Sequence, residues 1–359
     1  MGEYIFFDSH KHYTLAERED AESGRTRQCG IAHTRGAIRE YLSRCEARAA
    51  VAVEATANWY WIVEEIEQAG CRPLLTHPRK AKLMMGLINK TDKLDVHGMN
   101  TLQRNKTLPT VWIPPGPLRD LRELTRVRMV LARHRTRMKN RIQATLAKYG
   151  LVVEGFSDPH GKKARAEMNR QIALLPPQAQ YVTRLLCAQL DFTERQIQEQ
   201  EKRLRTLVPI TPEIQLLMSL PGIGVILGAV CALEIGDVGR FPSAERLAAY
   251  AGTTPRVHSS GDKTRYGRLR PDVNRYLRWA LIEAGHSIVL NCEKKPERHV
   301  SQLYRRLHAR RGHYKAVGAV ARHLAEAAYY LLSKKQPYRD PALRPRGGPA
   351  GAQGRTREA

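Results

Sequence analysis

The stretch "AAVAVEATAN", residues 49–58, decides the fold class, because a short apolar run leads straight to a carboxylate at Glu54. The stretch "YIFFDSH", residues 4–10, has the same form and reaches Asp8, and "CRPLLTHP", residues 71–78, is a third apolar run. Amphipathic helical segments separate these candidate strands. Strands that alternate with helices are typical of an α/β layer with some parallel pairing. We therefore expect an α/β fold in the N-terminal part of the chain.

A proline-rich stretch, "LPTVWIPPGP" at residues 108–117, marks a change of pattern, because its four prolines forbid a continuous helix. Beyond it, heptad-like spacing of apolar residues appears in two long segments, with a loop near residues 150–175 between them. The residues are Leu124, Val127, Leu131, Met138 and Tyr149 in the first segment, and Leu186, Leu190, Ile197, Leu204 and Leu207, with Thr193 and Gln200 as polar members, in the second. The pattern predicts an antiparallel coiled-coil arm.

The expected organisation is therefore α/β followed by α. The stretch after the arm has the pattern of short helices with basic loops, and the last residues are rich in Pro, Gly and Arg, which is typical of disorder. The predicted parts are an α/β catalytic domain at 1–112, a linker and coiled-coil arm at 113–210, a helical domain at 211–335, and a disordered basic tail at 336–359.

The charge of the chain is one-sided. Its 60 Lys and Arg against 35 Asp and Glu give a net charge of +25 and a pI near 10.1. Such a field attracts polyanions, so nucleic acid is the first expected partner and an acidic membrane surface the second. No run approaches the roughly 18 apolar residues of a spanning helix, so we expect no membrane insertion. The six cysteines form no CxxC pair, which disfavours zinc fingers and is typical of reduced thiols in a cytoplasmic protein.

Two carboxylates, Asp92 and Asp95, lie three residues apart in "NKTDKLDVHG", residues 89–98. On a helix this spacing places both on one face. Strand ends in an α/β sheet converge on one edge, where Asp8 and Glu54 would join them. Gathered carboxylates repel one another unless a cation neutralises them, and Mg²⁺ suits such a cluster because it takes oxygen ligands. The structural alternative stays open: Asp92 is the N-cap of a helix with Asp95 at N3, and the strand-end acids are caps or turn formers.

Four blocks of the N-terminal sequence resemble, in order, those of the DEDD transposases of the IS110 insertion-sequence family. The blocks are "YIFFDSHK", "VAVEATANWYW", "HPRKAK" and "NKTDKLDV". The resemblance implies an RNase H-like domain, similar to the RuvC Holliday-junction resolvases, with a site for two Mg²⁺ ions that Mn²⁺ can replace. The implied catalytic and metal-binding residues are Asp8, Glu54, Asp92 and Asp95.

Three positions depart from the pattern of that family. Phe6 stands where a small residue is usual, Ala57 replaces a glycine, and Val96 replaces an alanine. None of these changes removes a carboxylate, so the implied metal site survives them. Phe6 is expected to crowd the first strand.

Residues 217–261 resemble the C-terminal domain of the same family along their whole length. Their core, "LPGIG" at 220–224, is typical of a helix-hairpin-helix turn. Gly222 and Gly224 would let backbone N–H groups approach a DNA phosphate at a helix N-terminus. From the residues alone, a Pro-Gly turn between helices is also common structural punctuation.

The stretch "AGTTPRVHSSGDKTRYGRLR", residues 251–270, is more specific. In the family it resembles, a serine that precedes a glycine shortly after "TPR" is the nucleophile of a second half-site. The implied nucleophile is Ser260, with Ser259 as the fallback, in a loop rich in cations that suit attack on a phosphodiester. Taken without the family, the loop would be a flexible basic segment that only touches phosphates. The residues predicted to contact nucleic acid are Lys11, Lys90, Gly222, Gly224, Arg256, Lys263, Arg265 and Arg268.

The resemblance implies a transposase or recombinase of an insertion sequence, in a prokaryotic cell and associated with its nucleoid. It implies double-stranded DNA as substrate, strand exchange through a covalent phosphoserine link, a structured bridge RNA as guide, and a homodimer or homotetramer. Two alternatives are kept. The first is a RuvC-type metal-dependent junction nuclease without serine chemistry, and the second is a non-enzymatic basic protein that binds nucleic acid.

Overall fold

The computed structural model describes residues 2–86, 91–261 and 263–341. The chain forms two compact units that divide between Gly116 and Pro117. The helices of the predicted arm belong to the same unit as the C-terminal helices. None of the helices in the described ranges combines the length and the apolar character that crossing a bilayer requires.

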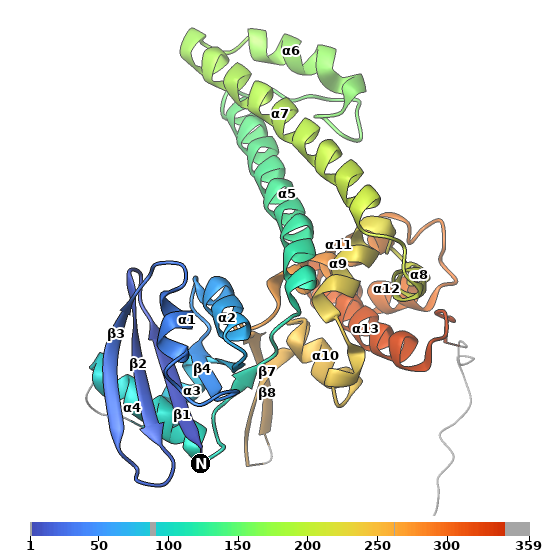
Figure 1. Cartoon of the computed structure of the whole chain (residues 1–359). Helices are drawn as coiled ribbons and strands as arrows, with labels where there is room; N and C mark the ends of the chain where they lie inside the picture. The colour runs from blue at the N-terminus through green and yellow to red at the C-terminus, as the bar shows by residue number, and fades with distance from the viewer. Residues whose placement is uncertain (1, 87–90, 262, 342–359) are drawn as a thin grey trace, which may run out of the picture. The chain divides into compact units, whose positions relative to one another are not determined.

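The first unit contains a six-stranded mixed sheet with the order β3-β2-β1-β4-β5-β6 (Figure 1). The strands are β1 (Glu3–Ser9), β2 (Tyr13–Asp20), β3 (Thr26–Ala32), β4 (Ala50–Glu54), β5 (Arg72–Thr76) and β6 (Thr110–Val111). β4 lies between β1 and β5 and is parallel to both, while the other pairs are antiparallel. The three apolar runs of the sequence are β1, β4 and β5, so the predicted α/β layer is confirmed.

Helices pack on both faces of this sheet (Figure 1). They are α1 (Ala37–Leu42), α2 (Trp59–Gln68), α3 (Pro78–Met85) and α4 (Asp92–Arg104). Successive side chains of a strand point to opposite faces. Ile5 and Phe7 of β1 therefore share a core with α1 and α2, whereas Phe6 shares a second core with Val96 and Met99 of α4.

Phe6, the large residue expected to crowd the first strand, is accommodated without a shift of register. It pairs with Ala52 of β4, and its side chain is buried. The small alanine leaves room for the ring, and Val96 fills the space next to it. A large residue opposite a small one keeps such a core densely packed.

The second unit begins with a long antiparallel pair of helices, α5 (Gly116–Lys148) and α7 (Pro177–Leu207) (Figure 1). A 3₁₀ turn, η1 (Lys162–Ala164), and α6 (Arg165–Ala173) connect the two long helices in the sequence. In α7 the predicted repeat is buried at Leu190, Thr193, Ile197, Gln200 and Leu204, but it is wrong at Leu207, which is 46% exposed at the end of the helix. The Gln200 side chain donates a 2.7 Å hydrogen bond to the Leu124 carbonyl of α5, which satisfies this polar member of the repeat.

The repeat predicted for α5 is wrong at two positions. Val127 is 40% exposed and Tyr149 is 42% exposed. Met138 is buried as predicted, and the other members of the buried stripe are Thr125, Met129, Ala132, Ile142 and Leu146. The buried stripe departs from the heptad spacing because the N-terminal turns of α5 also pack against the C-terminal helices. There Glu234 accepts a 2.8 Å hydrogen bond from Arg126, and the Arg122 guanidinium donates a hydrogen bond to the Leu233 carbonyl. These partners are more than 100 residues away in sequence, so the heptad pattern cannot report them.

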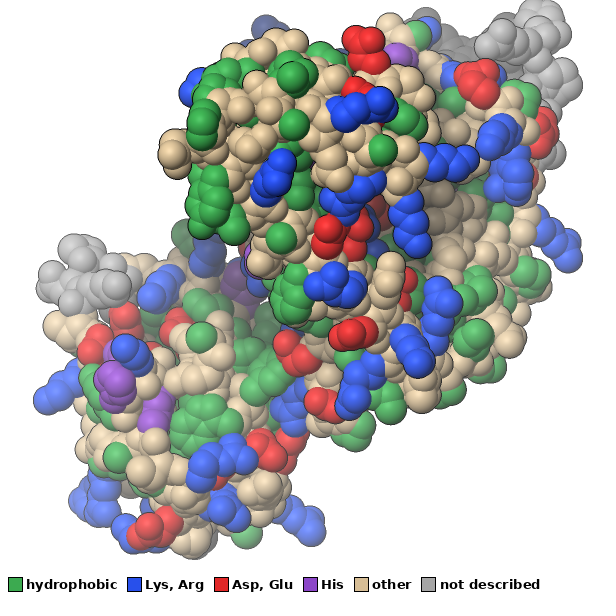
Figure 2. All heavy atoms as spheres, turned by 90° about the horizontal axis from the view of Figure 1, so that it is seen from above, with side chains coloured by type: hydrophobic (Ala, Val, Ile, Leu, Met, Phe, Trp, Pro, Cys, Tyr) green, Lys and Arg blue, Asp and Glu red, His purple; other side chains and the backbone are tan. Residues whose placement is uncertain are grey.

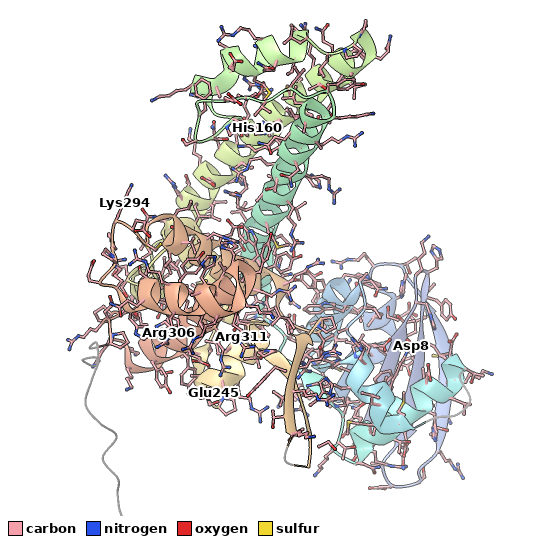
Figure 3. All side chains as sticks on the ribbon, turned by 180° about the vertical axis from the view of Figure 1, so that it is seen from behind. Asp8, His160, Glu245, Lys294, Arg306 and Arg311 are labelled. Atoms are coloured by element: carbon pink, nitrogen blue, oxygen red, sulfur yellow. The ribbon has the colours of Figure 1, made fainter. Side chains whose placement is uncertain are left out.

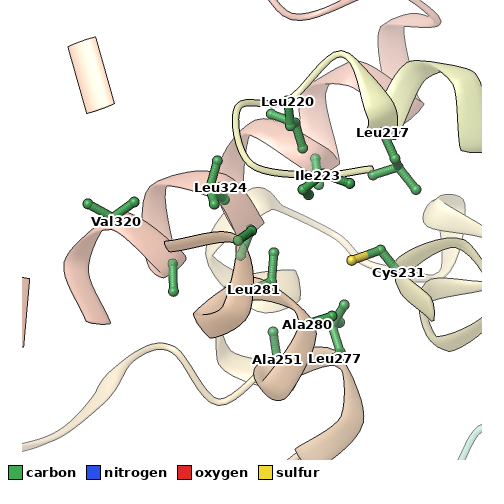
Figure 4. Packing of buried hydrophobic residues seen from close by; sticks show 14 of the residues in the cluster. Leu217, Leu220, Ile223, Cys231, Ala251, Leu277, Ala280, Leu281, Val320 and Leu324 are labelled. Carbon is green, nitrogen blue, oxygen red and sulfur yellow. The ribbon is translucent and has the colours of Figure 1, made fainter. Parts of the chain in front are cut away.

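The remaining helices surround one apolar core (Figure 4). They are α8 (Pro212–Met218), α9 (Val225–Ile235), the 3₁₀ turn η2 (Val238–Arg240), α10 (Ala244–Tyr250), α11 (Arg275–Leu290), α12 (His299–Arg311) and α13 (His313–Lys334). The strands β7 (Pro255–Ser260) and β8 (Lys263–Leu269) lie between α10 and α11 in the sequence and are mostly exposed. Leu217 and Ile223 meet Leu281 of α11 and Leu324 of α13 in this core. Within the segment 211–335, predicted to be helical, β7 and β8 are strands that pair as an antiparallel hairpin, so the prediction is wrong there.

Residues 336–341, predicted to begin a disordered tail, follow α13 without a helix or strand. Tyr338 packs against the C-terminal core, and its backbone N–H donates a 2.8 Å bond to Ser219 Oγ. The chain is thus held at this point by a partly buried ring. The rest of the predicted tail, 342–359, lies outside the described residues.

Candidate active site

The four predicted acids, Asp8, Glu54, Asp92 and Asp95, line one cavity of about 370 Å³ in the first unit. Asp8 lies on the sheet beside α4 (Figure 3). The other residues around the cavity are Phe6, Ser9, His10, Thr56, Lys82 and Met99. Carboxylates from two strands and one helix, up to 87 residues apart in the sequence, therefore reach a common space.

Strand register places the first two acids side by side. Phe7 of β1 pairs with Val53 of β4 in the parallel ladder, so Asp8 and Glu54 each lie one residue beyond this pair. Side-chain alternation puts both acids on the face that α4 covers. The period-two pattern that buries Phe6 therefore also directs Asp8 toward α4.

The helix N-terminus supplies the other two acids. Thr91 is the N-cap of α4, and its Oγ1 accepts a 3.3 Å bond from the Leu94 N–H. The alternative in which Asp92 caps this helix is therefore wrong, because Asp92 is already its first helical residue. Asp92 and Asp95 both remain free to line the cavity. Negative charge in the first turn is also favoured by the helix dipole.

Buried hydrogen bonds fix α4 on the sheet. Glu17 of β2 is fully buried and accepts 3.1 Å bonds from both the His97 ring and the Asn100 side-chain amide. Glu19, also buried, accepts a 2.6 Å bond from Arg104 near the end of the helix. These partners repeat along one face of α4 at helical spacing, so β2 holds the helix at several points and thereby sets the position of its first turn.

The cavity disfavours the charged forms of its buried carboxyl groups. Burial raises the pKa of the Asp8 carboxyl, and Asp92 and Asp95 add to the rise while His10 opposes it. Burial also raises the pKa of Glu54, with a further contribution from Asp8. Among the described residues, Glu54 Oε1 is buried and has no hydrogen-bond partner.

This donor set fits a divalent cation. A cation among the four acids would bring the buried Glu54 oxygen a partner and remove the repulsion between the carboxylates. Lys82 of α3 also lines the cavity and lowers the pKa of both Asp8 and Glu54, but its single charge faces four acids.

His10 is the cavity residue that sequence reasoning missed. Its Nε2 lies 3.5 Å from Asp8 Oδ2 and 3.6 Å from Asp92 Oδ2. A histidine two residues after an aspartate carries no recognisable spacing in the sequence. Only the turn between β1 and β2, together with the placement of α4, brings it into this position.

Ser260, the predicted nucleophile, lies in the second unit. It is the last residue of β7 and pairs with Lys263 of β8. The expectation of a loop is therefore wrong: the segment is a hairpin with an exposed serine near its tip. Ser259 Oγ lies 3.4 Å from Thr264 Oγ1 across the hairpin. Gly261 has φ +57°, a conformation that glycine adopts without strain.

Comparisons with known proteins bear on both halves of this arrangement. Residues 8–150 match a family model described as "Transposase", of the DEDD class of IS110 elements, and residues 214–301 match the "Transposase IS116/IS110/IS902 family". The two matched segments contain all four acids and Ser260, and together they span more than half of the chain. The chain belongs to the IS110 family of transposases.

Several curated relatives are also named as transposases. The transposase is 28% identical over 297 residues to a probable family 20 transposase of Pseudomonas aeruginosa, an alignment that covers 80% of this chain and 85% of the relative. It is 25% identical over 251 residues to the transposase for insertion sequence element IS1111A of Coxiella burnetii, covering 70% and 69%. It is also 25% identical over 252 residues to the transposase for IS1328 of Yersinia enterocolitica, covering 68% and 72%.

The two glycines predicted to contact DNA, Gly222 and Gly224, differ in the space around them. Gly222 has φ +77°, and a Cβ there would lie 2.4 Å from the Ala284 carbonyl oxygen of α11. Gly222 is thus required by packing within the unit. Gly224 is exposed at the N-cap of α9, where a Cβ would meet open space.

The predicted basic contacts are mostly exposed. Lys11 lies exposed in the turn between β1 and β2, and Arg256, Lys263 and Arg265 are exposed on the hairpin. Arg268 belongs to β8, but its side chain lies outside the described part of the chain, as does Lys90. Lys and Arg side chains are spread over the face of the transposase drawn in Figure 2, with Asp and Glu between them.

Proposed function

We propose that this transposase cuts and rejoins the DNA strands of an insertion sequence, with the four acids as metal ligands and Ser260 as the nucleophile. The observation that carries the proposal is the convergence of Asp8, Glu54, Asp92 and Asp95 on one cavity, with a buried Glu54 oxygen that lacks a partner among the described residues. The sheet order and its parallel centre support an RNase H-like domain around this site.

The four acids would hold Mg²⁺, as two ions, against the scissile phosphate. Bound magnesium supplies charge that stabilises the phosphoryl oxygens and the leaving oxygen. The contribution of the protein is position: β1 and β4 present two carboxylates, and the first turn of α4 presents two more. Because buried bonds to Glu17 and Glu19 hold α4, this geometry forms before DNA arrives.

Ser260 would act as the nucleophile. A bond forms between its Oγ and the phosphorus as the bond from phosphorus to the leaving sugar oxygen breaks, and that oxygen takes up the proton released from the hydroxyl. The phosphoserine link preserves the energy of the phosphodiester, so rejoining is the same step in reverse. The exposed position at the end of β7, beside Lys263, supports this role because a phosphate can approach it freely.

The partners of the reaction follow from membership in the family and from charge. Double-stranded DNA is the proposed substrate, with a structured bridge RNA from the element as guide, and the net charge of +25 suits both. The α5–α7 pair would be the coiled-coil arm that joins protomers into a homodimer or homotetramer. The proposed setting is the cytoplasm of a prokaryotic cell, at the nucleoid.

The test uses the purified full-length transposase with DNA of its element ends and Mg²⁺, with and without co-expressed RNA. Covalent protein–DNA adducts are mapped by mass spectrometry. The expected adduct is on Ser260, lost in Ser260→Ala and kept in Ser259→Ala. An adduct on another residue would contradict the assignment of the nucleophile.

A second candidate, the RuvC-type nuclease, is favoured by one observation: the acid cavity is complete within the first unit. It predicts that Ser260→Ala still cleaves junction DNA at the wild-type rate and that Asp92→Asn does not. A non-enzymatic basic protein would instead keep every function in Asp92→Asn. The proposed transposition mechanism requires both variants to lose strand transfer, each by about a thousandfold or more.

A further inference from the structure

The acid cavity contains a nitrogen donor as well as carboxylates. His10 Nε2, an oxygen of Asp8 and an oxygen of Asp92 all lie within 4.8 Å of one another. Nε2 is buried and makes no hydrogen bond within the described residues. The donor therefore lies at ion-pair distance from two carboxylates but is hydrogen-bonded to neither of them.

The position of the His10 ring is set by the fold. Its backbone N–H donates a 2.9 Å bond to the Tyr13 carbonyl in the turn between β1 and β2, and its own carbonyl accepts a 2.9 Å bond from Asn58 at the start of α2. The ring also packs against Tyr13, with 4.7 Å between ring centroids. Backbone and ring are thus held from several sides, independently of the acids.

The distances from Nε2 to the two carboxylates suit a shared ion better than hydrogen bonds. An N–H···O bond brings the two heavy atoms to about 2.7–3.2 Å, whereas here they are 3.5 and 3.6 Å apart. Two donors that are each about 2.1 Å from one ion lie about 3.0–3.5 Å apart at angles near those of octahedral or tetrahedral coordination. The observed separations are therefore close to those of ligands around a common cation.

We propose that His10 is a nitrogen ligand of this metal site and makes it prefer Mn²⁺ over Mg²⁺. The inference rests on the proposed function of the four acids as metal ligands and adds a specificity to it. Mg²⁺ takes oxygen ligands almost exclusively, while imidazole nitrogen suits first-row transition ions. One imidazole among carboxylates therefore raises the affinity of the site for Mn²⁺ relative to Mg²⁺, while Mg²⁺ still binds through the acids.

Pulsed electron paramagnetic resonance on the full-length protein loaded with Mn²⁺ tests the assignment directly, because a bound imidazole couples its nitrogen nucleus to the manganese electrons. His10→Phe keeps a flat ring on Tyr13 but removes the nitrogen, and His10→Asn is a second variant in case the first folds poorly. His12→Phe is the matched control, since His12 lies exposed in the same turn. Asp92→Asn identifies the manganese that belongs to the site.

The expected result is a nitrogen coupling in the wild type and in His12→Phe that is absent from both His10 variants. Calorimetric titration should show that the His10 variants bind Mn²⁺ about tenfold more weakly, with Mg²⁺ affinity changed less than about threefold. If manganese binds in an Asp92-dependent way but shows no coupling to His10, the inference fails and the acid site stands. If no Asp92-dependent manganese is found, the proposed metal site fails and the inference fails with it.

Discussion

The acid cavity and the serine hairpin carry the two halves of the proposed chemistry, and the chain builds them in opposite ways. The cavity is held by buried polar contacts, with Glu17 and Glu19 almost inaccessible to solvent. The hairpin is open to solvent, with Val257 57% and Tyr266 73% exposed. An ion site needs donors fixed in advance, whereas a nucleophile that engages a large substrate can take its final position with that substrate. The fold therefore fixes the positions of the carboxylates in advance and leaves the serine hairpin exposed.

Hydrogen exchange gives the largest expected contrast between the two regions. A two-stranded hairpin is marginally stable by itself, while a central strand opens only with its whole domain. Amide protection in β1 and β4 should exceed that in β7 and β8 by about a thousandfold or more in the free protein. Equal protection in the two regions would mean that the hairpin is as firmly held as the sheet and would remove the contrast.

Breaking the support of α4 tests whether the cavity depends on it. Glu17→Ala removes the acceptor that the His97 ring and the Asn100 amide share, and it leaves the buried Asn100 side chain poorly satisfied. Urea unfolding should show a loss of about 3 kcal/mol. Metal affinity should fall as well, because the first turn of α4 would no longer be fixed.

The control for this variant is Glu40→Ala. Glu40 pairs with Arg44 at the surface, and both side chains are 71% exposed, so no measurable loss is expected. If Glu17→Ala kept both stability and metal affinity, the buried network would not be what positions Asp92 and Asp95.

Two glycine substitutions extend the comparison to the second unit, with smaller effects of opposite sign. Gly222→Ala adds a Cβ against the Ala284 carbonyl at a positive φ, so thermal unfolding should report a loss of about 2 kcal/mol. Gly318→Ala, within α13 and facing open space, should instead stabilise by about 0.5–1 kcal/mol. If both substitutions lowered the stability by a similar amount, close packing against α11 would not explain why position 222 needs glycine.

The convergence of the four acids on one cavity could be predicted because each acid follows a local signal. Asp8 and Glu54 end short apolar runs, and Asp92 and Asp95 have the spacing of one helix face. The strands β2 and β3 were missed because their charged residues contradict a simple apolar pattern. Glu17 and Glu19 are buried only because α4 brings His97, Asn100 and Arg104 to them from about 80 residues away.

The hairpin was missed for a different reason. Its strands are polar and exposed, so they show no apolar alternation. One signal was available: Gly261 and Asp262 separate the two segments, and such a pair is typical of a two-residue β-hairpin connection. His10 could not have been found from sequence, because its neighbours in the cavity come from β1 and α4.

Magnesium-dependent unfolding of the full-length protein at two pH values tests the central claim most directly. The pKa values of Asp8 and Glu54 are raised in the folded state, so folding retains protons there that the unfolded chain releases above about pH 4. The stability of the metal-free protein should therefore fall as pH rises through the raised pKa values. Mg²⁺ at a hundredfold excess over its Kd should add about 2–3 kcal/mol at pH 7.5 and less at pH 5, where protons compete.

Glu54→Gln removes one buried charge, so it should stabilise the metal-free protein at pH 7.5 and weaken the response to Mg²⁺. Glu64→Gln, at an exposed ion pair on α2, should change neither quantity. A wild-type protein whose unfolding is the same with and without Mg²⁺ at pH 7.5, and which Glu54→Gln destabilises, would contradict the claim that these acids share divalent cations.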